Sequence, residues 1–131
     1  MKNLLDKIFF RNNNLENISE RIKDLSNTKQ CTKIFNCINS YSDKSEIRFV
    51  GGCIRKILNN EQVDDIDLAT NLEPNEVSEV LKSNQINFYE TGIEHGTITA
   101  VIDEKKFEIT SLREDIFTDG RHAKVKFSKD W

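Results

Sequence analysis

The chain has 131 residues, which suits one domain with a modest hydrophobic core. Its formal net charge is −3, and this acidic balance argues against a protein that holds RNA by itself, because phosphate contacts need a basic surface. No apolar run approaches the roughly 20 residues of a membrane span, and the start of the chain lacks the uninterrupted apolar stretch of a signal peptide. We therefore expect a cytoplasmic protein that makes no contact with a membrane.

The cysteines give no sign of a cross-link or a metal centre. Cys31, Cys37 and Cys53 form no CxxC pair, and their number is odd. Both facts argue against a disulfide framework and against a zinc site. We expect all three thiols to be reduced, as is usual in the cytoplasm.

The first 45 residues are polar and predict helices. Apolar residues recur at helical spacing within 4–9, 18–25 and 34–38. Three consecutive asparagines, Asn12, Asn13 and Asn14, predict a break between helices. No chemistry is evident here, so we interpret residues 1–45 as a helical lead-in that serves packing and solubility.

Strand-like runs begin at Ile47 and then alternate with helical ones. The sequence predicts a strand at 47–50, a helix at 53–58, a strand at 65–69 and a helix that Pro74 opens and that runs to Leu81. A strand at 86–89, a hairpin of 97–102 and 106–112, a polar loop at 115–123 and a strand at 125–127 follow. The pattern predicts a small mixed sheet flanked by helices, an α/β (α+β) domain, over residues 46–131.

Two glycines separate the first strand of this domain from its first helix. Gly51 and Gly52 have no Cβ, so the backbone there can approach a bulky anion closely. A helix start adds free N–H groups that favour a phosphate. Arg55, in the first helical turn, brings forked donors for phosphate oxygens. Taken alone, however, a Gly-Gly turn is more often structural than functional.

Three acidic residues fall on predicted strands. Asp65 and Asp67 are two apart in one strand, so both carboxylates project from the same face. Close like charges repel unless a cation lies between them, and Mg²⁺ prefers such oxygen ligands. Glu108, on a later strand, joins the pair if the two strands are neighbours. A lone D-x-D is more often a solvated strand end with two surface acids, and Glu108 by itself is equally well interpreted as an exposed hairpin carboxylate.

Together these features resemble the layout of polymerase-β-like nucleotidyltransferases, and longer matches narrow the family. The segment 50–55, VGGCIR, resembles the V-G-G-x-V-R signature of tRNA CCA-adding enzymes and bacterial poly(A) polymerases. Segments 65–70 (DIDLAT) and 92–97 (GIEHGT) resemble the D-x-D-x-A-T and G-x-x-H-G-T motifs of that family. Segments 108–113 (EITSLR) and 118–121 (TDGR) resemble its E-V-T-T-[FL]-R motif and the start of its flexible loop.

The resemblance implies a polymerase-β-like fold and a two-metal transfer of nucleotides from ATP or CTP to the 3′ end of RNA, above all tRNA, with release of pyrophosphate. It implies that three acids are catalytic and bind Mg²⁺: Asp65, Asp67 and Glu108. It implies that the triphosphate contacts Gly51, Gly52 and Arg55. Arg113 and Arg121 are further candidates for the triphosphate or for loop positioning, and His95 is interpreted as part of a turn.

Two features depart from the family pattern. Lys56 stands where the family commonly has Asp, which predicts a local change only. The sequence stops at Trp131, before the R-R-D-F-T-x-N-A and E-D-x-x-R segments with which the family contacts the ribose and selects the base. We therefore expect residues 46–131 to be a head domain truncated before the nucleotide-selecting region. We expect it to be weakly active or inactive alone, with RNA held mainly by absent regions.

Three functional classes remain open at this level. The first is the head of a CCA-adding enzyme, with poly(A) synthesis as an alternative that shares the same motifs. The second is a non-catalytic nucleotide- or metal-binding module that needs a partner chain. The third, a nucleotidyltransferase acting on a protein or an antibiotic, accounts for the glycine pair and the D-x-D but not for segments 94–97 and 118–121.

Overall fold

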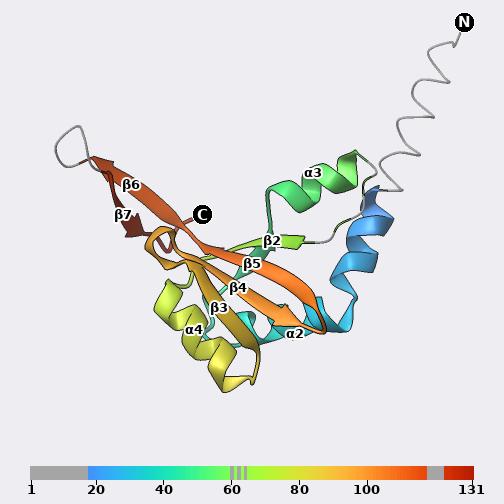
Figure 1. The fold of residues 1–131 in the computed structure, drawn as a ribbon, viewed down its shortest axis with the longest axis horizontal. Coiled ribbons are helices and arrows are strands. Elements are labelled where there is room, and N and C mark those ends of the chain that lie inside the picture. The colour runs from blue at the N-terminus through green and yellow to red at the C-terminus, as the bar shows by residue number, and fades with distance from the viewer. Residues whose placement is uncertain (1–17, 60, 62, 64, 118–122) are drawn as a thin grey trace, which may run out of the picture.

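The structure is a computed structural model, and it describes residues 18–59, 61, 63, 65–117 and 123–131. A helix over residues 18–26 leads into α2 (Lys29–Asn39), after which strands and helices first alternate and four consecutive strands then follow (Figure 1). The remaining elements are β1 (Ile47–Phe49), α3 (Gly52–Leu58), β2 (Asp65–Thr70), α4 (Pro74–Ser83), β3 (Asn87–Gly92), the 3₁₀ turn η1 (Ile93–His95), β4 (Thr97–Ile102), β5 (Lys105–Ser111), β6 (Arg113–Phe117) and β7 (Ala123–Phe127).

Five strands form one mixed sheet in the order β1-β2-β5-β4-β3. β2 and β5 are parallel neighbours although α4, β3 and β4 lie between them in the sequence, and the other pairs are antiparallel. β6 and β7 form a separate two-stranded ribbon, which extends away from the sheet in Figure 1. The predicted mixed sheet flanked by helices is therefore confirmed.

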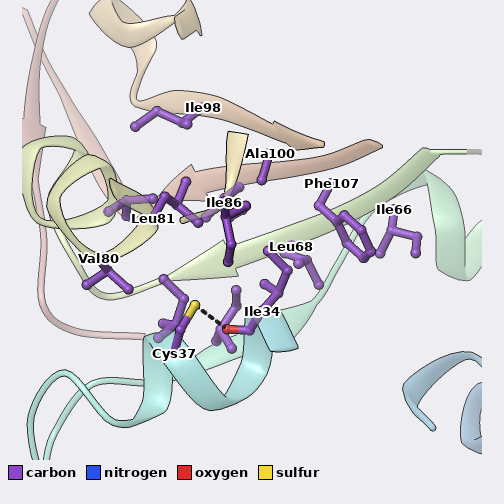
Figure 2. Packing of buried hydrophobic residues seen from close by; sticks show 14 of the residues in the cluster. Ile34, Cys37, Ile66, Leu68, Val80, Leu81, Ile86, Ile98, Ala100 and Phe107 are labelled. Carbon is purple, nitrogen blue, oxygen red and sulfur yellow. Dashed lines mark hydrogen bonds between the residues drawn. The ribbon is translucent and has the colours of Figure 1, made fainter. Parts of the chain in front are cut away.

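One face of the sheet is buried against α2 and α4. The apolar residues of β2, β4 and β5 that point to this face are Ile66, Leu68, Ile98, Ala100, Phe107 and Ile109. Figure 2 shows most of them in one cluster with Ile34 of α2 and Leu81 of α4. Burial of this apolar surface is the dominant favourable term in folding. Because strand residues alternate between faces, the acidic residues of β2 and β5 are left on the opposite face.

The end of β2 is fixed by partly buried hydrogen bonds to the segment that precedes β1. The Thr70 hydroxyl donates to the carbonyl oxygen of Glu46 over 2.8 Å. The Asn71 side chain accepts from the Glu46 N–H over 2.8 Å and donates to the Lys44 carbonyl over 2.7 Å. These bonds set the register of β1 against β2, and this register determines which residue of β2 lies beside the turn that leaves β1.

Most element positions match the sequence prediction, and α4 begins at Pro74 as expected. The prediction of a polar loop over 115–123 is wrong at both ends, because Ala123 begins β7 and residues 115–117 belong to β6. Their strand conformation comes from pairing with β7, where Asp115 lies opposite Val125. Residues 118–122 lie outside the described part of the chain, as do the helical face at 4–9 and the break at 12–14.

The three cysteines are free and buried, and burial raises the pKa of each thiol. Across the described ranges, no helix is both long and apolar enough to span a bilayer.

Candidate active site

The turn after β1 brings two glycines against Asp67. The Val50 N–H donates to the Asp67 carbonyl over 2.9 Å, so the turn starts directly beside this residue. Gly51 has φ +64°, in the left-handed region that side chains other than glycine rarely adopt. A Cβ on Gly52 would lie 2.9 Å from Oδ2 of Asp67, which is closer than real Cβ atoms approach. One glycine is thus required by its backbone conformation and the other by the close approach of a carboxylate.

The first turn of α3 interacts directly with the same carboxylate. The Cys53 N–H donates to Oδ2 of Asp67 over 3.2 Å. Arg55, two residues further along α3, is exposed to solvent. The glycine turn and the start of α3 therefore lie on the β1 side of Asp67, and Arg55 lies on the exposed surface of the same helix.

The strand register brings the three predicted acids together on the open face of the sheet. Asp65 and Asp67 alternate with the buried Ile66 in β2. Asp67 lies opposite Glu108 in the parallel pair of β2 and β5. Asp67 is half-buried, whereas Asp65 and Glu108 are exposed. The sequence placed Glu108 with the aspartates only on condition that the strands are neighbours, and the structure meets that condition.

The surroundings of Glu108 disfavour its ionised form. Its pKa is raised, first by loss of hydration, then by a hydrogen bond with Asp67 and by the negative charges of Asp67 and Asp65. Lys106 acts in the opposite direction. Nearby like charges disfavour full ionisation of such a group unless a cation compensates them.

The donor set fits a hard cation that arrives together with a phosphate ligand. Within the described residues, no group of three His, Cys, Asp or Glu side chains forms a ready-made metal cage. Mg²⁺ does not need one, because it is usually bound by one or two carboxylates and completes its shell with waters and substrate phosphates. The carboxylates of Asp65, Asp67 and Glu108 offer oxygen ligands of this kind, so their chemistry is compatible with such an ion.

Arg113 makes its printed contact at a turn and not at the carboxylates. Arg113, in β6, donates from Nη1 to the carbonyl oxygen of His95 over 2.7 Å and so ties β6 to η1. Gly96, which follows His95 in the chain, has φ +80°, and a Cβ there would lie 2.6 Å from the Phe127 ring. His95 thus occupies a turn that is fixed from two sides. Arg121 lies outside the described residues.

Sequence reasoning missed a group of hydroxyls beside the acids, which we call the threonine cluster: Thr91, Thr97, Thr99 and Thr110. The hydroxyls of Thr91 and Thr99 are 2.9 Å apart, and those of Thr97 and Thr110 are 3.2 Å apart. The alternation of Thr97 and Thr99 in a predicted strand was the available signal, because it places both on one face.

Comparisons with known proteins agree with this architecture. The family model described as Poly A polymerase head domain matches residues 47–131. The human mitochondrial CCA tRNA nucleotidyltransferase 1 is 42% identical over 104 residues, which cover 79% of this chain and 23% of that protein. A CCA-adding enzyme of Listeria monocytogenes is 40% identical over 84 residues, covering 63% of this chain and 20% of the enzyme.

A solved structure supports the same assignment. The crystal structure of the Bacillus stearothermophilus CCA-adding enzyme in complex with CTP superposes with a TM-score of 0.57 and 27% identity, covering 74% of this chain and 21% of that chain. The chain spans about a fifth of the length of the relatives it matches. The family model covers well over half of the chain, the predicted resemblance is confirmed, and the chain belongs to the poly(A) polymerase head-domain family of nucleotidyltransferases.

Proposed function

We propose that this chain provides the catalytic head of a template-independent RNA nucleotidyltransferase, and that its reaction is the addition of CMP and AMP to the 3′ end of tRNA. One observation carries the proposal. Asp67 lies between the glycine turn, which can approach a phosphate, and Glu108, which completes a carboxylate group. The proposed phosphate-binding turn and the proposed metal-binding carboxylates are therefore both adjacent to Asp67.

In the proposed reaction the 3′ oxygen of the RNA attacks the α-phosphorus of a nucleoside triphosphate. A new O–P bond forms, the bond to the bridging oxygen breaks, and pyrophosphate leaves with the electron pair while the 3′ hydroxyl proton passes to solvent. Mg²⁺ bound by Asp65, Asp67 and Glu108 would neutralise the phosphates and lower the pKa of the attacking hydroxyl. Gly51, Gly52 and Arg55 orient the triphosphate, which is the part of catalysis that positioning supplies.

The two distal arginines have a smaller part in the proposal. Because Arg113 is engaged with the His95 carbonyl, we assign it to positioning of η1 rather than to the triphosphate. Arg121 is kept as a candidate contact for the triphosphate on its sequence motif alone.

Two alternatives belong to other classes of function. Poly(A) synthesis uses the same head, but the named relatives with the stated identities are CCA-adding proteins, which favours tRNA. A non-catalytic module that needs a partner chain would keep the glycine turn and still bind a nucleotide. Such a module would differ from the enzyme in that nucleotide binding would not depend on the carboxylates of Asp65, Asp67 and Glu108.

The test is a titration of ¹⁵N-labelled chain with Mg²⁺ and ATP, in which amide shifts are followed residue by residue. We expect the largest shifts at Gly51, Gly52 and Asp67, and their loss in Asp67→Asn. The matched control is Glu90→Gln, which removes an exposed carboxylate of β3 outside the site and should leave the shifts unchanged. Shifts that persist in Asp67→Asn would favour the non-catalytic module, and absence of shifts at millimolar ligand would contradict the proposal.

A further inference from the structure

The open face of the sheet changes from carboxylates to hydroxyls on the side of Glu108 that is away from the glycines. Thr99 of β4 lies directly opposite Glu108, so Asp67, Glu108 and Thr99 form one row across β2, β5 and β4. Thr97 of β4 lies opposite Thr110 of β5 in the next row. Paired residues on neighbouring strands project from the same face. The threonine cluster therefore adjoins the carboxylates directly.

The cluster is a neutral surface of paired hydroxyls. Thr99 is only 2% exposed, and its hydrogen bond with Thr91 fixes it in place. Thr97 and Thr110 are half-buried and within reach of a ligand. In a hydroxyl pair one O–H is used between the partners, which leaves one donor and several lone pairs for a third group. Such a surface suits the hydroxyls of a sugar better than it suits a phosphate.

The in-line geometry of the proposed transfer indicates which sugar would lie at the threonine cluster. Attacking and leaving oxygens are roughly in line in phosphoryl-type transfer. If the triphosphate lies on the glycine side of Asp67, pyrophosphate leaves on that side, and the attacking hydroxyl must come from the β5–β4 side. That side carries Glu108 and then the threonine cluster.

We propose that the threonine cluster is the subsite for the terminal ribose of the RNA strand that accepts the nucleotide, with Thr97 and Thr110 binding its 2′-hydroxyl. The inference rests on the proposed function and deepens it. It assigns to these two residues a preference for an RNA end over a DNA end, because the 2′-hydroxyl is the group that distinguishes them.

The experiment uses the chain labelled with ¹³C at the threonine methyls. The probes are the dinucleotide CpC and the same dinucleotide without the 2′-hydroxyl on its 3′-terminal sugar. We expect shifts at Thr97 and Thr110, and binding of the ribose form about fivefold tighter, as one net hydrogen bond provides. Thr110→Val and Thr97→Val should each abolish the preference, and Thr110→Ser should restore it. Thr32→Val, on the distant α2, is the control that should keep it.

Equal affinity for the two dinucleotides, or no threonine shift at millimolar probe, would overturn the inference. The Mg²⁺ and ATP titration on the same samples separates this failure from failure of the proposed function. If ATP shifts Gly51 and Gly52 while CpC leaves the cluster unaffected, only the ribose subsite is wrong. If neither probe produces shifts, the proposed function and the inference both fail.

Discussion

Replacing Gly52 with alanine should reduce ligand binding at the site strongly while lowering the stability of the fold only slightly. The added Cβ would lie 2.9 Å from Oδ2 of Asp67, so the carboxylate must rotate away. Rotation breaks the 3.2 Å hydrogen bond from the Cys53 N–H. Bonds to charged groups contribute about 1.5–3 kcal/mol, but water replaces part of this at a half-exposed carboxylate, and alanine has the higher helix propensity. We expect a net loss of about 1 kcal/mol in unfolding free energy.

The effect on the site should be far larger than the effect on stability. We expect Gly52→Ala to lower the melting temperature by about 3–6 °C and to weaken binding of Mn²⁺ with ATP at least tenfold, measured by water proton relaxation. Gly92→Ala is the matched control, because a Cβ there meets Thr97 at an ordinary 3.8 Å and φ is −173°, which any residue adopts. If Gly52→Ala binds Mn²⁺ and ATP as well as Gly92→Ala does, the close approach of the turn to Asp67 has no role in the site.

Three other predictions concern stability. Gly96→Ala should destabilise the chain by about 2 kcal/mol in urea unfolding, because it combines φ +80° with a clash against Phe127; an unchanged midpoint would contradict the packing of this turn. The raised pKa of Glu108 means that the folded state binds more protons than the unfolded state between about pH 4.3 and the raised value. Stability without metal should therefore fall as pH rises through this window, and Glu108→Gln should remove that part of the pH dependence; an unchanged profile would show that folding does not raise the pKa of Glu108. Glu104→Gly, at φ +68° in the β4–β5 turn, should stabilise the chain by about 1 kcal/mol, and a lower melting temperature would refute it.

Local pattern was sufficient for most of the fold. The alternation in β2 identifies its buried and open faces without any tertiary information, and Pro74 marks the start of α4. β6 could not be predicted in the same way, because its residues become a strand only by pairing with β7. The parallel pairing of β2 with β5 is likewise a product of topology, since α4, β3 and β4 separate the two strands in the chain.

In the candidate site, too, some residues could be predicted from local sequence and others only from the tertiary structure. The glycine pair and the two aspartates are recognisable from their spacing within a few residues. They could therefore be identified as candidate site residues from the sequence. The threonine cluster could not be identified in this way, because only the pairing of β4 with β5 shows that Thr99 lies opposite Glu108. The contact of Arg113 with the His95 carbonyl joins residues that are 18 positions apart and has no sequence signature of its own.

The central claim is that a divalent cation and a triphosphate bind together at Asp65, Asp67 and Glu108, beside the glycine turn. The most direct test is paramagnetic broadening of amide signals by Mn²⁺ in the presence of ATP. We predict broadening at Gly51, Gly52 and the two aspartates, and its loss in Asp65→Ala and in Asp67→Ala while both variants keep the dispersed spectrum of a folded chain. Broadening that survives both substitutions, or that is centred elsewhere on the chain, would contradict the account.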